Sequence, residues 1–374
     1  MIYLDYVASS PIEPRVLDEF IKVSKEYIAN PNSSHKLGVK SKELIDECTI
    51  KIAKILNVLP SEIIYTSGST ESNNLAIKGL LSKYANRGKH IITTKLDHSS
   101  VIGPIEEFGK DGYEIDTVSI DNNGIIDKEE LKELLRKDTV LLTIPYIDNE
   151  LGIKQPLADI VEILKEYPNC FLFSDATQAI GKVKVDFTGI DLVTVSPRKF
   201  YGIGGIGILI KKDNVLLNPI IHGGKSTTMY RSGTPELPLI ASAAKSLEIA
   251  VESLEENNKK ISKFQNDIKT FLESFSDIII NSRNDSVPNI INFSIKNINV
   301  SEFVLELEKY EIYVSTKAPC CPKNSVSRPV FALTNDKKLA LGTIRISISH
   351  KTQQEELDEF YEKFKICCDK FQIR

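Results

Sequence analysis

One stretch decides the fold, Val195-Ser-Pro-Arg-Lys-Phe-Tyr-Gly-Ile-Gly-Gly-Ile-Gly207, in which a single lysine precedes a glycine-rich turn. Lys199 follows the apolar run Ile190 to Val195, and the apolar strand Ile206 to Ile210 comes after the turn. Desolvation in such a turn lowers the pKa of an amine and makes it a nucleophile towards aldehydes. The pattern therefore indicates a lysine that carries pyridoxal phosphate as a Schiff base. The alternative is an ordinary lysine at a strand end beside a structural turn.

An acidic residue upstream favours the cofactor interpretation. Asp175 ends a second apolar run, Cys170 to Phe173, and lies about 24 residues before Lys199. Enzymes that use pyridoxal phosphate need a carboxylate against the pyridinium nitrogen, so that the ring acts as an electron sink. Neighbouring strands of an α/β fold present their carboxyl ends to one crevice, so we expect the two side chains to meet there.

Length and composition limit the class of protein. The 374 residues suffice for two domains, and 41% hydrophobic and 26% charged residues are ordinary for a globular chain. A net charge of −4 and a pI near 5.9 give no case for nucleic acid as a direct partner. No apolar run is long enough to span a membrane, and the first residues do not read as a signal peptide. The six cysteines form no plausible disulfide framework, so we expect a cytoplasmic location with free thiols.

The order of apolar runs predicts an α/β fold with two domains. Short apolar strands alternate with amphipathic helices as far as about Pro235, which predicts a mostly parallel sheet covered on both faces. A single long helix is expected over about 238–275 as the connector between domains. We predict a large cofactor-binding domain at residues 14–250, and a smaller α+β domain made of residues 1–13 and 251–374.

A small-residue segment suggests an anion site. Gly68-Ser-Thr-Glu-Ser lies between an expected strand, 62–66, and an expected helix. Free backbone N–H groups at the positive end of a helix dipole suit a phosphate. Simple capping of the helix, with Glu71 in its first turn, is an equally good explanation of the same residues.

Taken in order, six motifs resemble the class V aminotransferase family and, within it, the cysteine desulfurases. They are Tyr3-Leu-Asp-Tyr, Tyr65-Thr-Ser-Gly-Ser-Thr-Glu-Ser-Asn-Asn-Leu-Ala, Asp148-Asn-Glu-Leu-Gly, Asp175-Ala-Thr-Gln, Ser196 to Lys199, and Arg231-Ser-Gly-Thr. The resemblance spans nearly the whole chain and implies a fold-type I pyridoxal phosphate enzyme, typically a homodimer, with a seven-stranded type of sheet in its large domain.

The resemblance also implies roles for individual residues. His98 would stack on the cofactor ring and could relay a proton, the alternative being a helix-start histidine bonded to backbone. Arg345, in Thr343-Ile-Arg-Ile-Ser, would clamp the substrate carboxylate with its planar fork, the alternative being an exposed strand arginine. Four residues would contact the cofactor phosphate: Ser69, Thr70, Ser196 and, from the partner subunit, Thr234. Gln178 would bind the phenolic oxygen of the cofactor. Asn149 would bind that oxygen or the substrate carboxylate. No metal site is expected.

The sulfur acceptor is expected in Ser315-Thr-Lys-Ala-Pro-Cys-Cys-Pro-Lys. By its position, Cys320 matches the mobile-loop cysteine of the resembled enzymes, and Cys321 is one residue away. Nearby lysines would favour the thiolate that attacks sulfur. The alternative is a pair of loop cysteines without chemistry. The remaining cysteines are predicted to pack in the core: Cys48, Cys170, Cys367 and Cys368.

These features together predict a pyridoxal-phosphate-dependent L-cysteine desulfurase. It would release alanine and pass a persulfide to an acceptor or scaffold protein, for iron–sulfur cluster or thio-cofactor biosynthesis. The alternatives are a selenocysteine lyase, another class V lyase or transaminase, or a poorly catalytic paralogue that binds the cofactor. Two departures keep the last of these open. Thr316-Lys-Ala-Pro replaces the small residues that the family has before the cysteine, and Arg198 stands where the family commonly has histidine. Arginine cannot relay a proton at neutral pH.

Overall fold

A seven-stranded sheet forms the centre of the computed structural model, which describes residues 1–224, 227–283, 285–316 and 326–374. Its strands run in the order β2-β8-β7-β6-β5-β3-β4, and only β8 is antiparallel to its neighbours. The predicted mostly parallel α/β sheet is therefore confirmed. The strands are β2 (Ile63–Thr66), β3 (His90–Thr94), β4 (Glu114–Val118), β5 (Thr139–Thr143), β6 (Phe171–Asp175), β7 (Leu192–Val195) and β8 (Gly207–Lys211).

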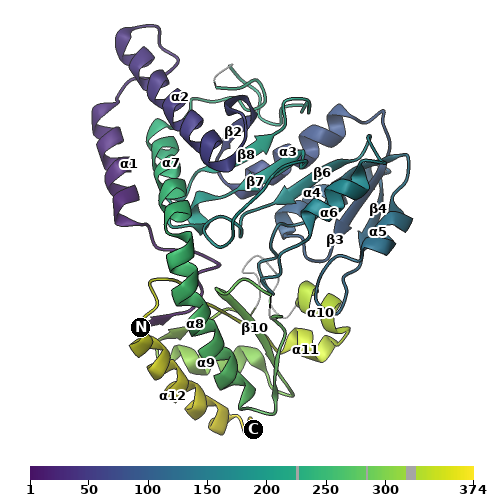
Figure 1. Ribbon diagram of the computed structural model, residues 1–374, viewed down its shortest axis with the longest axis vertical. Helices are drawn as coiled ribbons and strands as arrows, with labels where there is room; N and C mark the ends of the chain where they lie inside the picture. The colour runs from purple at the N-terminus through teal and green to yellow at the C-terminus, as the bar shows by residue number, and fades with distance from the viewer. Residues whose placement is uncertain (225–226, 284, 317–325) are drawn as a thin grey trace.

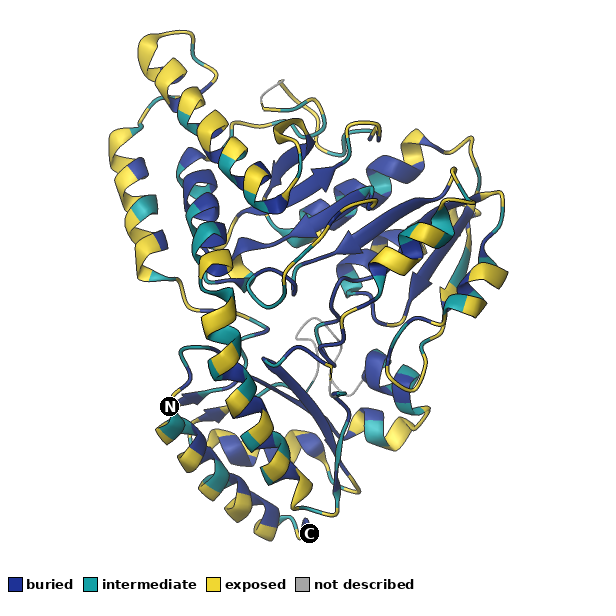
Figure 2. Cartoon of the chain, in the orientation of Figure 1, coloured by how far each residue is buried: buried dark blue, intermediate teal, exposed yellow. Residues whose placement is uncertain are grey.

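Both faces of this sheet are covered, because successive strand residues point to opposite sides. Ile91 and Leu141 belong to one buried apolar cluster, and the next residues, Ile92 and Leu142, belong to another. Figure 2 shows the strands buried and the outer helix faces exposed. The first cluster packs on α3 (Ser69–Lys83) and α4 (Ser99–Lys110); the second packs on α1 (Pro14–Glu26), α2 (Lys36–Leu56), α5 (Lys128–Leu134), α6 (Leu157–Leu164) and α7 (Leu237–Glu252).

A second group of elements surrounds a separate core (Figure 1). An antiparallel sheet runs in the order β12-β10-β9, and β1 pairs with β11 in parallel. Its elements are β1 (Ile2–Tyr3), α8 (Leu254–Glu273), β9 (Ile278–Ile280), β10 (Ile290–Ile295), α9 (Val300–Glu308), β11 (Ile312–Tyr313), β12 (Thr343–Ser347) and α12 (Gln354–Lys370). Two short helices, α10 (Arg328–Thr334) and α11 (Lys337–Leu341), pack against residues from the large-sheet half, including Leu96 and Leu151. The division into domains at residue 250 stays a prediction.

Two details differ from expectation. The single helix expected over about 238–275 is two helices, because α7 ends and α8 begins at Ser253, whose hydroxyl donates to the Ile249 carbonyl at 2.6 Å. The edge strand β4 was not expected, since its sequence Glu-Ile-Asp-Thr-Val is polar and largely open to solvent. Among the residues that the structure describes, no helix is long and apolar enough to cross a membrane.

Candidate active site

A cavity of about 430 Å³ lies where the strands of the large sheet end. Strands β2, β3, β5, β6 and β7 run in the same direction, so the loops that follow them meet at this edge. The N-terminal segment and β12 supply the opposite wall. The lining residues are Val7, Ala8, Ser69, Thr70, Leu96, His98, Pro145, Ile147, Asp148, Asn149, Asp175, Thr177, Gln178, Arg198, Lys199 and Arg345.

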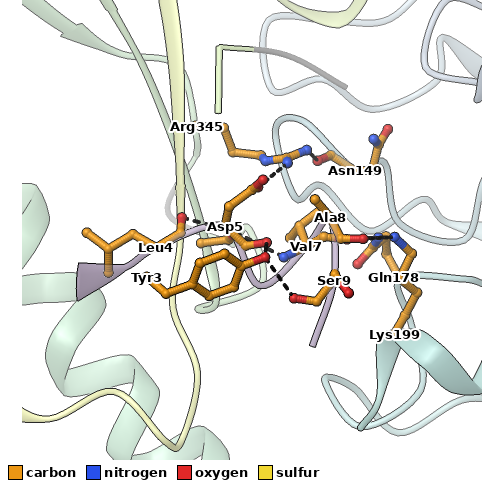
Figure 3. A network of polar contacts seen from close by, with 11 residues as sticks. Tyr3, Leu4, Asp5, Val7, Ala8, Ser9, Asn149, Gln178, Lys199 and Arg345 are labelled. Atoms are coloured by element: carbon orange, nitrogen blue, oxygen red, sulfur yellow. Dashed lines mark hydrogen bonds and ion pairs between the residues drawn. The ribbon is translucent and has the colours of Figure 1, made fainter. Parts of the chain in front are cut away.

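Lys199 ends the single turn η2 (Pro197–Lys199), directly after β7. Its Nζ donates to the carbonyl oxygens of Val7 at 2.9 Å and Ala8 at 2.6 Å (Figure 3). Desolvation, then the positive charges of Arg198 and Arg345, lower the pKa of this amine to about 8. An amine with that pKa is partly neutral near pH 7 and can act as a nucleophile or as a base.

The turn after Lys199 requires glycine at one position. A Cβ atom on Gly202 would lie 2.8 Å from both the Cβ and the carbonyl oxygen of Pro197, closer than real contacts allow. The Gly202 N–H donates to that same carbonyl at 2.9 Å. The close approach fixes the turn that presents Lys199 to the cavity.

Asp175 closes β6 and is held by two donors. Its Oδ2 accepts from Asn73 Nδ2 at 2.9 Å, and its Oδ1 accepts from the Thr177 N–H at 2.9 Å. Its side chain is nearly enclosed, with 7% of the residue exposed. The orientation of the carboxylate is therefore set by its neighbours before any ligand binds.

Asn73 was missed by the sequence analysis. It lies one helical turn after Ser69, completely buried, and also donates to Ser100 Oγ at 2.8 Å. Its spacing from Ser69 places it on the same face of α3, which is a signal that could have found it. It links the carboxylate to the start of α4.

His98 is the residue before α4 and lines the cavity. Its Nδ1 accepts from the Ser100 N–H at 3.2 Å and lies 2.8 Å from Ser100 Oγ. The bonding to backbone, which was the alternative explanation, is thus present, but the ring also reaches the cavity. Beneath it, burial raises the pKa of Asp97 to about 6 in spite of hydrogen bonds from Thr143 and Thr93.

Arg345 is completely buried in the middle of β12, so the alternative of an exposed strand arginine is wrong. Its Nη2 donates to Asp5 Oδ1 at 2.7 Å and its Nη1 to the Asn149 carbonyl at 2.8 Å (Figure 3). Its Nε has no hydrogen-bond partner among the described atoms. One N–H donor of the guanidinium is therefore buried without a partner in the described part of the chain.

The N-terminal segment was expected only as a strand-like opening, yet it runs through the site. Asp5 pairs with Arg345, and the Val7 carbonyl accepts from both Lys199 and Gln178 Nε2, the latter at 3.3 Å. Gln178 Oε1 in turn accepts from the ammonium group of Lys182. The contacts of Asp5 and of the Val7 carbonyl join residues more than 170 positions apart, so pattern analysis could not anticipate them.

The residues predicted to contact a phosphate are separated in the structure. Ser69 and Thr70 line the cavity at the start of α3, where the first N–H groups have no intrahelical acceptor. Ser196 is buried just after β7, outside the residues that line the cavity. Thr234 lines a different, shallower pocket, whose Arg231 donates from Nε to Glu71 Oε1 of α3 at 2.9 Å.

The predicted acceptor cysteines, Cys320 and Cys321, lie outside the described residues. On one side of them Ser315 pairs with the backbone of Arg345, which lines the cavity, and on the other Ser327 Oγ donates to Glu150 Oε2 at 2.5 Å. The four described cysteines are free and buried, which confirms that they pack in the core: Cys48, Cys170, Cys367 and Cys368. Burial raises the pKa of all four thiols, so they are poor nucleophiles.

No group of three or more histidine, cysteine, aspartate or glutamate side chains that could hold a metal ion occurs in the part of the chain that the structure describes. The polar groups that line the cavity include a lysine, a histidine, two carboxylates, two amides and two arginines. This set suits an organic anion with a ring nitrogen and a carboxylate-bearing amine substrate.

The sequence of this chain is similar to those of several known proteins. Residues 2–360 match the profile of "Aminotransferase class-V". The chain is 35% identical to a protein named "Cysteine desulfurase IscS" from Dictyoglomus turgidum, over 96% of this chain and 92% of that one. It is 34% identical to the protein of the same name from Neisseria meningitidis serogroup C, over 97% and 91%.

Solved structures agree with these sequences. A structure titled "NIFS-LIKE PROTEIN" has a TM-score of 0.93 at 33% identity, over 98% of this chain and 99% of that one. A second, titled "SspA in complex with cysteine", has a TM-score of 0.82 at 29% identity, over 93% and 99%.

Proposed function

Because this chain belongs to the aminotransferase class V family, we propose that it is a pyridoxal-phosphate-dependent L-cysteine desulfurase. It releases alanine and retains the sulfur as a persulfide. One observation carries the proposal: Lys199, Asp175 and Arg345 line the same cavity in a chain that matches cysteine desulfurases over nearly its full length.

The residues around the cavity fit the cofactor. Asp175 is a pre-oriented carboxylate for a ring nitrogen, and the start of α3 offers N–H groups to a phosphate. Lys199 has the lowered pKa that a covalent attachment site needs. Thr177 Oγ1, two residues after Asp175, is buried without a hydrogen-bond partner among the described atoms. When bound, pyridoxal phosphate acts as an electron sink that weakens bonds at the substrate Cα.

The chain's own residues then orient the substrate and move its protons. Arg345 orients the substrate carboxylate and therefore presents the Cα proton to Lys199. Lys199 Nζ takes that proton, which its lowered pKa allows near neutral pH. Asp175 stabilises positive charge on the ring nitrogen, and His98 lies at the same wall as a stacking and proton-carrying group.

Sulfur transfer requires a thiolate. We assign this role to Cys320, with Cys321 as the other candidate. The thiolate attacks the sulfur of the bound substrate, the new S–S bond forms as the substrate C–S bond breaks, and the released carbon fragment is protonated to alanine. The contact of Ser315 with Arg345 supports this, because Arg345 lines the cavity, and Ser327 bonds to Glu150, the residue after the lining residue Asn149.

Further partners belong to the proposal. Thr234 lies outside the cavity of its own chain, which supports a homodimer in which it reaches the partner's phosphate. The persulfide would pass to an acceptor or scaffold protein. The four free thiols among the described cysteines support a cytoplasmic location.

The direct test is mass spectrometry of the purified, cofactor-loaded protein after addition of L-cysteine. We expect one extra sulfur on the peptide that contains Cys320 and Cys321, with one alanine released for each sulfur gained. Cys320→Ser should lose the adduct, and Cys321→Ser should keep it. Alanine without any adduct, or an adduct that survives in both single variants, would contradict the assignment.

The pH dependence of cofactor incorporation tests the role of Lys199. Since its pKa is lowered to about 8, the neutral, reactive amine increases as the pH rises from 6 and saturates above about 8. An ordinary lysine would keep gaining reactivity up to a pH of about 10.4. Stopped-flow absorbance on cofactor-free protein gives the rate. Arg198→Gln removes one of the positive charges that lower this pKa, so its midpoint should move to higher pH; an identical profile in both proteins would contradict the prediction.

A further inference from the structure

A second cavity lies beside Lys199 and is lined in part by residues of α7 and α8. Its volume is about 160 Å³, and its lining residues include Lys182, Lys199 and His350. Lys199 lines both cavities, whereas Gln178 lines only the larger one and Lys182 only the smaller one. The side chains of Lys182 and Gln178 therefore meet in the wall between the two cavities.

Lys182 is an unusual residue for such a wall. It forms no ion pair within the described residues, and its ammonium group donates to Gln178 Oε1. Desolvation, followed by the positive charges of Lys199 and Arg345, lowers its pKa to about 7. Keeping a cation here costs free energy, which a purely structural position would avoid with an apolar side chain.

The contact fixes which end of the Gln178 amide faces the larger cavity. In its protonated form Lys182 only donates hydrogen bonds, so it then faces the carbonyl oxygen of the amide and not its NH₂ group. The Val7 carbonyl on the other side requires a donor and receives Gln178 Nε2 at 3.3 Å. Both neighbours select the same orientation, which leaves the second N–H of Gln178 Nε2 available to a ligand.

We propose that Lys182 is a positioning residue, which holds Gln178 as a hydrogen-bond donor to the phenolic oxygen of the cofactor. This inference rests on the proposed function, because it concerns the cofactor that the function requires. Without Lys182, the amide can turn and offer its oxygen to another oxygen atom, which repels it. Lys182 touches neither substrate nor cofactor and acts only through Gln178.

The visible absorbance of the loaded, resting protein tests the proposal without measuring turnover. A donor to the phenolic oxygen stabilises the less protonated form of the bound cofactor. Losing that donor should raise the midpoint of the pH-dependent absorbance change by about one pH unit. We expect this shift in Lys182→Met and in Gln178→Met. The double variant should shift no further than Gln178→Met alone, because both changes remove one interaction.

Two control variants separate this effect from a general loss of charge or packing. Lys182→Arg keeps a group that only donates, so its midpoint should match the parent. Lys211→Met removes a buried lysine elsewhere in the chain, whose Nζ donates to the carbonyls of Lys212 and Val215, and should also leave the midpoint unchanged. If Lys182→Met does not fold by circular dichroism, Lys182→Gln, whose amide can donate or accept, should show a smaller shift in the same direction.

The outcomes are distinct. An unchanged midpoint in a folded Lys182→Met or Lys182→Gln protein, or full additivity in the double variant, would overturn the role of Lys182. A parent protein that gains no visible band with pyridoxal phosphate would instead overturn the proposed function.

Discussion

Replacing Lys199 with alanine is expected to lower the rate of alanine release from L-cysteine on the order of 10⁴-fold. The variant loses both the covalent attachment site and the base that moves the Cα proton, whereas Arg345 remains to bind the substrate. The KM for L-cysteine should therefore change much less than kcat. Steady-state assays of alanine, with cofactor in excess, measure both parameters.

A matched variant separates chemistry from packing at the same position. Lys199→Arg keeps a cation that can donate to the carbonyls of Val7 and Ala8, but an arginine is neither a nucleophile nor a base at neutral pH. We expect it to be as inactive as Lys199→Ala and to keep the parent's thermal stability. Substantial activity in either variant would refute the assignment of Lys199.

The structure indicates what Arg198 contributes to the site. The family commonly has a histidine before the attachment lysine, and the sequence suggested that a proton relay is lost here. The side chain of Arg198 is exposed and lines the cavity, and its charge is the second cause of the lowered pKa of Lys199. A permanent cation thus contributes by making Lys199 easier to deprotonate, a role that needs no proton transfer of its own.

The parts of the site that follow strands could be predicted from the sequence. Asp175, Lys199 and His98 each come shortly after an apolar run, and parallel strands bring such positions to one edge of the sheet. This pattern of an apolar run followed by a polar residue is local and repeated, so it can be recognised without knowledge of the tertiary structure. The break at Ser253 and the polar strand β4 were missed because tertiary packing and edge position outweigh local pattern there.

The contacts that hold these residues in place could not be predicted. Lys199 bonds to carbonyl oxygens about 190 positions earlier in the chain, and Arg345 pairs with a carboxylate 340 positions away. Neither contact follows from periodicity or spacing, since a backbone carbonyl carries no sequence signal. Lys182 lies only four residues after Gln178, but the spacing does not say which end of the Gln178 amide it faces.

Replacing Arg345 is also expected to have a large effect, because this residue is buried and paired with Asp5 before any substrate binds. Arg345→Met should raise the KM for L-cysteine by roughly 10- to 100-fold, the loss of one or two hydrogen bonds between charged groups. It should also lower the free energy of unfolding by about 3 kcal/mol, since the carboxylate of Asp5 loses its buried partner. Alanine-release kinetics and urea unfolding measure the two effects separately.

Asp5→Asn is the matched control, because it keeps an oxygen acceptor for Arg345 Nη2 but removes the opposing charge. We expect its KM for L-cysteine to stay within about threefold of the parent, since hydrogen bonding still orients the guanidinium. If Arg345→Met retained the parent's KM, its role as the carboxylate clamp would be wrong. If Asp5→Asn raised the KM as much as Arg345→Met does, a hydrogen bond to the introduced amide would not be enough to orient Arg345. The negative charge of Asp5 would then be required for substrate binding.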